Sequence, residues 1–126
     1  MATLVDQDFF ARLLLLSDKF AASVPGMLAR LATLRAVFDP HAPAPESVAE
    51  LRQILHTVAG SAATFGFRAM GYQARALEQR LRVLMAFDVI APRDWESWLV
   101  SLDNYLAWAE IDPQSKNYPD ENVQQQ

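Results

Sequence analysis

Two histidines are the most obvious nucleophiles of this sequence, and one of them has unusual neighbours. His56 is followed by Gly60 four residues later and by Gly66 ten residues later, within the stretch LHTVAGSAATFGF that spans residues 55–67. The residues between the glycines are mostly small. An imidazole is partly unprotonated near neutral pH, so one ring nitrogen can attack an electrophile such as a phosphoryl group. This stretch is therefore our first candidate for a functional site.

The sequence lacks the residues that other common catalytic sites require. The chain has no cysteine, which excludes disulfides and thiolate metal sites. Its four glycines are scattered, so no glycine-rich phosphate loop is present, and serine-nucleophile signatures are missing. The carboxylates do not form a Glu-x-x-His pattern with His56, and His41 lies in a proline-rich loop (DPHAPAP). We predict no metal site and no bound cofactor.

The local preference of the chain is helical throughout, because glycine is scarce and runs of β-branched residues are absent. Apolar residues recur at helical spacing over residues 6–20, 25–38, 45–64, 68–86 and from 92 to about 110. The first two segments could form one kinked rod around Pro25. We favour two helices, because proline is tolerated in a first helical turn.

These segments predict an all-α fold, an antiparallel four-helix bundle with an additional N-terminal helix that covers one end. Residues 1–110 would form this domain. Residues 111–126 are polar with two prolines, and we expect a disordered tail there.

A helical projection gives the segment 45–64 two different sides. At about 100° per residue the apolar residues fall within one arc: Leu51, Ile54, Leu55, Val58, Ala62 and Phe65. The opposite side carries Gln53, His56, Gly60 and Ala63. His56 is therefore predicted to be exposed. Gly60 costs roughly 1 kcal/mol of helix propensity against alanine, and close approach by another molecule would explain it.

The following segments supply most of the remaining core. In 68–86 the apolar stripe consists of Met70, Ala74, Leu77, Leu81 and Leu84, and in the last helix of Trp95, Trp98, Leu99, Leu102, Tyr105 and Leu106. Gly71 would allow close helix packing, and Gly66 would end the preceding helix in a left-handed conformation. Arg75, Glu78 and Arg82 are spaced as neighbours, and we interpret them as a solvated ion-pair ladder rather than a phosphate clamp.

Charge and hydropathy give expectations about partners and location. The net charge of −4 does not favour nucleic acid binding. The apolar run at residues 13–16 is too short to span a bilayer, and the acidic start of the chain is unlike a secretory signal. We expect a cytoplasmic protein without a membrane partner.

The residues from His56 to Ala62 (HTVAGSA), with Gly66 and the later Leu77-Glu78, resemble the histidine-containing phosphotransfer (HPt) domain family. The resemblance implies a four-helix bundle with an accessory N-terminal helix that relays phosphoryl groups between response-regulator receiver domains. His56 matches the phosphoaccepting histidine, and Gly60 matches the glycine that permits receiver docking. The resemblance is most specific over about thirty residues and extends from the first helix to the fifth.

One position departs from the family pattern. Family members usually carry lysine or arginine three residues after the histidine, whereas this chain has Ala59. That cation would orient and screen the phosphoryl group. Arg82 lies where some members place a basic residue on the neighbouring helix, and Arg75 and Arg52 are further candidates.

The resemblance implies a phosphoryl carrier rather than a self-sufficient enzyme. Its partners would be receiver domains, which would supply a divalent metal, and a hybrid histidine kinase. The receiver would dock on Gln53, Ala59, Gly60, Ala63 and Thr64, with the chain as a monomer. An alternative is a docking module that binds a receiver without being phosphorylated. A histidine-kinase phosphoacceptor domain is disfavoured, because Thr57 stands where an acidic residue is common and no ATP-binding domain fits in this length.

Overall fold

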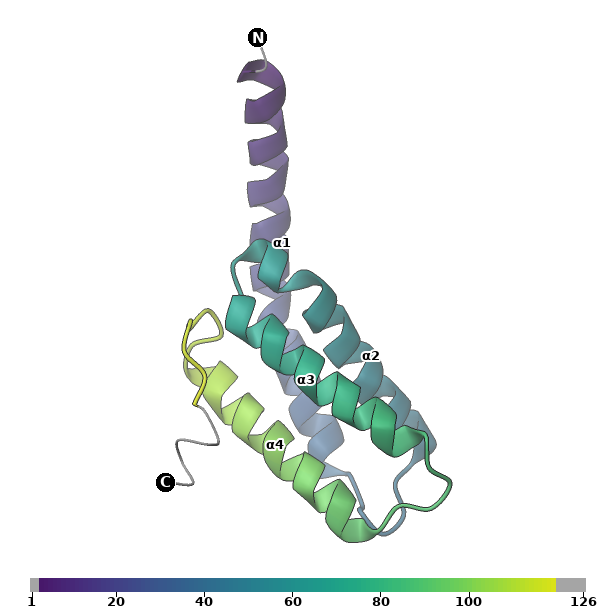
Figure 1. The fold of residues 1–126 in the computed structure, drawn as a ribbon. Helices are drawn as coiled ribbons and strands as arrows, with labels where there is room; N and C mark the ends of the chain where they lie inside the picture. The colour runs from purple at the N-terminus through teal and green to yellow at the C-terminus, as the bar shows by residue number, and fades with distance from the viewer. Residues whose placement is uncertain (1–2, 120–126) are drawn as a thin grey trace.

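The computed structural model describes residues 3–119, with side chains from Asp6 onward. Four α-helices and one short 3-10 helix follow one another: α1 (Thr3–Ala36), α2 (Pro45–Ser61), η1 (Ala63–Phe65), α3 (Arg68–Met85) and α4 (Pro92–Ile111). No strand occurs in this range. The four helices pack side by side as a bundle, and the N-terminal half of α1 extends beyond it (Figure 1). The all-α prediction is confirmed.

The predicted break in α1 is wrong. One helix runs from Thr3 to Ala36 with Pro25 inside it, so the additional N-terminal helix is the first half of α1. Proline removes one helical hydrogen bond and normally kinks a helix. Here Val24 and Leu28 are buried on either side of Pro25, and packing of this kind outweighs local preference. This half of α1 also projects away from the bundle instead of covering its end (Figure 1).

The core lies between the four helices and contains the predicted apolar stripes. All six predicted residues of the last helix are buried, and Trp98 and Tyr105 are completely inaccessible. Trp98 Nε1 donates to the Leu77 carbonyl at 3.0 Å, and the Tyr105 hydroxyl donates to the Met70 carbonyl at 3.1 Å. Burial raises the pKa of the Tyr105 phenol, which therefore stays a neutral donor. These two bonds fix α4 against α3.

Two arginine–carboxylate pairs hold α1 against its neighbours. Arg30 Nη2 donates to Glu50 Oε1 of α2 at 2.7 Å, and this contact lowers the pKa of the exposed Glu50 carboxyl. Arg35 donates to both oxygens of Asp103 on α4, at 2.8 and 3.1 Å. Such forked contacts fix direction more than they add stability at the surface.

The first part of the predicted tail, residues 112–119, contacts the end of α4. The helix α4 includes Ile111, and the following residues fold back onto it. Trp108 Nε1 donates to the Asn117 carbonyl at 2.8 Å, and the rings of Trp108 and Tyr118 lie 5.0 Å apart. The aromatic contact gives this polar segment an anchor that its composition does not suggest. Residues 120–126 lie outside the described part of the chain.

Within the described residues, none of the helices combines the length and the apolar character needed to cross a bilayer.

Candidate functional site

The outer face of α2 presents His56 to solvent, as the helical projection predicts. The His56 side chain is 60% exposed, and Gln53, Gly60, Ala63 and Thr64 are exposed as well, whereas Ala59 is half-buried. Four members of the predicted apolar arc are buried (Leu51, Leu55, Val58 and Ala62), and Ile54 and Phe65 are half-buried. The structure thus brings the sequence-predicted docking residues together around the imidazole.

Gly60 has no packing role within the described part of the chain. A Cβ atom built at Gly60 would meet nothing within 4 Å. The glycine therefore leaves a low step beside His56 while weakening the helix by roughly 1 kcal/mol. An incoming molecule can approach the backbone closely at this step.

The end of α2 differs from the prediction by one turn. The α-helix stops at Ser61, and Ala63–Phe65 continues as a 3-10 helix to Gly66, whose φ of 90° is left-handed as predicted. The Phe67 amide then donates to the Ala62 carbonyl at 2.8 Å. This tight turn buries Phe67 and starts α3 beside α2.

Gly71 sets how closely α3 approaches α2. A Cβ atom at Gly71 would lie 3.0 Å from the Ala62 Cβ and 3.2 Å from the Ala63 amide nitrogen. The two helices are therefore nearly in backbone contact at this level, and Gly71 is the glycine with the predicted packing role. The close contact fixes the register of the two antiparallel helices.

This register places Glu78 of α3 against His56, and the predicted ion-pair ladder is wrong. Glu78 is 5% exposed, and both of its carboxylate oxygens lie 3.4 Å from His56 Nδ1. No ion pair joins Glu78 to Arg75 or Arg82 among the described residues. The sequence spacing indicated that Glu78 is a neighbour of Arg75 and Arg82. It did not indicate that the Glu78 side chain is buried against α2.

The Glu78 carboxylate has few partners for a buried charge. Its Oε2 atom is buried without a hydrogen bond, and the 3.4 Å contact with His56 is longer than a typical N–H···O bond. Leaving a buried carboxylate so poorly paired is costly, which is typical of functional rather than stabilising groups.

The contact selects the nitrogen of His56 that can react. A carboxylate beside Nδ1 favours the tautomer that carries its proton there, and the tautomer is inferred from this contact. The lone pair then belongs to Nε2, which points away from Glu78 on the ring. The arrangement is that of an exposed nitrogen nucleophile oriented by a carboxylate.

The same register locates the three candidate arginines. Because His56 faces Glu78, one turn in either direction places Ala59 opposite Arg75 and Arg52 opposite Arg82. Arg75 and Arg82 are exposed and Arg52 is half-buried. The backbone register thus places three arginines about one turn from His56 along α2 and α3.

The second histidine is not part of the site. His41 lies exposed in the loop after α1. Its backbone amide donates a hydrogen bond to Asp39 Oδ1 at 2.9 Å. Among the described residues, no group of three or more His, Cys, Asp or Glu side chains could hold a metal ion.

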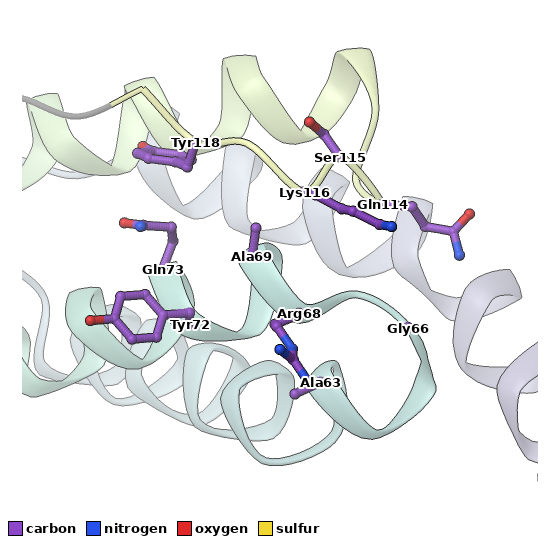
Figure 2. Close-up of a pocket in the computed structure, with 10 residues that line it drawn as sticks. All are labelled: Ala63, Gly66, Arg68, Ala69, Tyr72, Gln73, Gln114, Ser115, Lys116 and Tyr118. Atoms are coloured by element: carbon purple, nitrogen blue, oxygen red, sulfur yellow. The ribbon is translucent and has the colours of Figure 1, made fainter.

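A pocket of about 730 Å³ lies at the end of the docking face, between the start of α3 and the segment after α4 (Figure 2). It shares Ala63 with the docking residues, and Arg68 and Lys116 supply two cationic groups to its lining. Tyr72 and Tyr118 lie at its other end (Figure 2). The pocket extends the surface available to a docked partner beyond η1.

Comparison with known proteins gives one family. The family model of the Hpt domain matches residues 16–107, which is most of the chain and includes α2, η1 and α3 in full. Neither the curated proteins nor the solved structures gave a match. Hpt domains take part in histidine phosphotransfer in phosphorelays and interact with response-regulator receiver domains. The chain belongs to the Hpt domain family.

Proposed function

We propose that His56 accepts a phosphoryl group from the aspartate of one receiver domain and passes it to another. The observation that carries the proposal is the exposed imidazole whose Nδ1 faces the buried Glu78 carboxylate. The open step at Gly60 supports it, because a receiver must bring its reactive site within bonding distance of the ring. The chain itself acts as a carrier.

The transfer step uses the Nε2 lone pair. Nε2 forms the new N–P bond while the P–O bond to the receiver aspartate breaks and its electron pair returns to that carboxylate. The proton on Nδ1 stays in place, so the phosphorylated ring gains positive character that Glu78 stabilises. The receiver supplies the divalent metal that neutralises the phosphoryl oxygens, and this chain needs no cofactor.

Arg75 takes the place of the cation missing at position 59. It lies on α3 opposite Ala59, one turn from Glu78 and on the exposed side of that helix. A guanidinium there can reach toward the oxygens of a phosphoryl group on His56. Arg82 and Arg52 lie on the other side of the ring and have a secondary role.

The receiver docks on Gln53, Ala59, Gly60, Ala63 and Thr64. These residues surround His56 on one exposed face, and their small side chains leave the backbone accessible. A hybrid histidine kinase carrying a receiver domain is the expected upstream donor.

Replacing His56 should abolish phosphate uptake. After incubation with a phosphorylated receiver, the wild type should carry acid-labile, base-stable phosphate and His56→Gln none. His41→Gln is the matched control and should label as the wild type does. If the wild type binds the receiver but never becomes labelled, the chain is a docking module rather than a carrier.

Replacing Gly60 should block docking without unfolding the bundle. Gly60→Gln places a side chain on the open step, and we expect receiver affinity to fall at least about tenfold, or 1.4 kcal/mol. Helix stability should rise slightly, since glutamine is the better helix former. Ala107→Gln on α4, which does not contact α2, is the control. Titration calorimetry would measure both, and equal affinities for the two variants would exclude this docking face.

Removing the Arg75 charge should slow transfer to His56. We expect about a three- to tenfold loss for Arg75→Gln, in the range of one partly exposed charge-assisted hydrogen bond. Ala59→Lys should speed the wild type and restore the rate of Arg75→Gln. Arg80→Gln, on the same helix but bonded to Ser101, is the control. Rapid-quench kinetics would measure the rates, and a larger loss in Arg82→Gln would assign the role to Arg82 instead.

Replacing Glu78 should separate ring orientation from stability. In Glu78→Leu we expect the His56 tautomer preference to be lost, as seen by ¹⁵N NMR of the ring, together with slower transfer. The free energy of unfolding should stay equal or rise by about 1 kcal/mol, because an apolar side chain replaces a poorly paired buried charge. Glu110→Gln, at an exposed position of α4, is the control. An unchanged tautomer would show that Glu78 does not position the ring.

A further inference from the structure

The N-terminal half of α1 carries an uncovered apolar surface. Its large apolar side chains are at least half exposed: Phe9 (54%), Phe10 (59%), Leu14 (66%), Leu15 (57%) and Leu16 (50%). This part of the helix stands clear of the bundle (Figure 1), and most of it precedes the family match that begins at residue 16. An apolar patch of this length is unusual on a monomer and is typical of an interface.

The exposed stripe continues the core-facing stripe of the same helix. At 100° per residue, Phe9, Leu13, Leu16 and Phe20 lie within roughly 80° of the face that buries Val24, Leu31 and Leu34 lower in α1. Counted from the N-terminus, Phe20 is the first residue of this stripe whose ring packs against aromatic rings of the bundle. Its ring lies 5.6 Å from that of Phe65 and 5.2 Å from that of Phe67.

We propose that this surface, from Phe9 to Leu16, binds the same surface of a second copy of the chain. The helix already packs through this face in the bundle, so a second helix with an identical stripe fits it in the same manner. The inference goes beyond phosphotransfer and replaces our expectation of a monomer.

The charge of the segment favours a protein over a membrane surface. Between Asp6 and Phe20 the helix carries three aspartates, one arginine and one lysine. Helices that lie on anionic lipid have a strongly basic polar face instead. Because these charges nearly cancel, two copies of the segment can approach each other without strong repulsion.

Steric fit makes the pair antiparallel. A parallel partner helix on this face would run into η1 and α2, which pack against α1 from Phe20 onward. An antiparallel partner carries its own bundle away in the opposite direction. In the register that we test, Leu13 lies level with Leu14 of the partner, and Phe10 lies level with Ser17 of the partner.

The area sets the expected affinity. Half-exposed large side chains lose about 100 Å² each, so the five of each copy bury at most about 1,000 Å² in the pair, near the lower limit for a specific interface. We therefore expect a dimer with a dissociation constant of roughly 1–100 µM.

Analytical ultracentrifugation of the full chain tests the dimer. The wild type should associate with concentration, and Phe9→Glu/Leu16→Glu should remain monomeric. The double variant should keep the thermal unfolding midpoint that the wild type shows when dilute and monomeric, because neither residue belongs to the core. Val89→Glu, at an apolar residue that is 90% exposed elsewhere, is the control and should dimerise. A monomeric wild type at about 500 µM, or a dimer that the double variant leaves intact, would overturn the proposal.

Introduced thiols test the orientation, since the chain has no cysteine of its own. Mixing Phe10→Cys with Ser17→Cys should give a disulfide-linked heterodimer, while each variant alone should cross-link poorly. Efficient cross-linking of either variant with itself would contradict the antiparallel pair. Binding to phosphatidylcholine–phosphatidylglycerol vesicles without self-association would assign the surface to lipid and equally overturn the proposal.

Discussion

The close approach of α3 to α2 at Gly71 determines the geometry of the site. Any side chain at this position would press on Ala62 and on the backbone of Ala63, so the register of the helix pair depends on a missing Cβ atom. Seven residues along α3, this register places Glu78 beside His56. It also aligns Arg75 with Ala59. The acceptor ring, its orienting carboxylate and the nearby cation therefore all follow from one backbone contact.

Glu78 is a buried residue that lowers the stability of the fold and that the proposed transfer uses. A leucine at this position would suit the buried side of α3, and the carboxylate there lacks a hydrogen bond to one oxygen. In the proposed transfer, a developing positive charge on the His56 ring accounts for this carboxylate, because a buried carboxylate stabilises such a charge far better than water does. Gly60 is a second such position in the proposed mechanism, because it weakens α2 and leaves open space where a partner would dock. Both residues lie close to His56. Gly60 is one turn further along α2, and the Glu78 carboxylate contacts the His56 ring.

The sequence predicted the features that follow from periodicity. The two sides of α2, the exposure of His56, the left-handed Gly66 and the aromatic core of α4 all depend on local spacing. It failed where tertiary contacts decide. Pro25 indicated a break, but buried residues on both sides keep α1 continuous. Glu78 has the spacing of a surface ladder, and its burial depends on how near α3 lies to α2. The contact between Trp108 and Tyr118 likewise joins residues ten apart, and the polar composition of the segment 112–119 does not indicate it.

The family pattern also explains why Ala59 need not prevent transfer. A basic residue at that position acts through the location of its charge, and a helix packed in fixed register can deliver a charge to the same place from the opposite side. Arg75 meets this requirement because it lies one turn from Glu78, at the level of Ala59. The two positions are thus alternatives in space although they lie far apart in the sequence. A pattern confined to α2 would report the cation as lost, whereas in the proposed mechanism Arg75 of α3 supplies it.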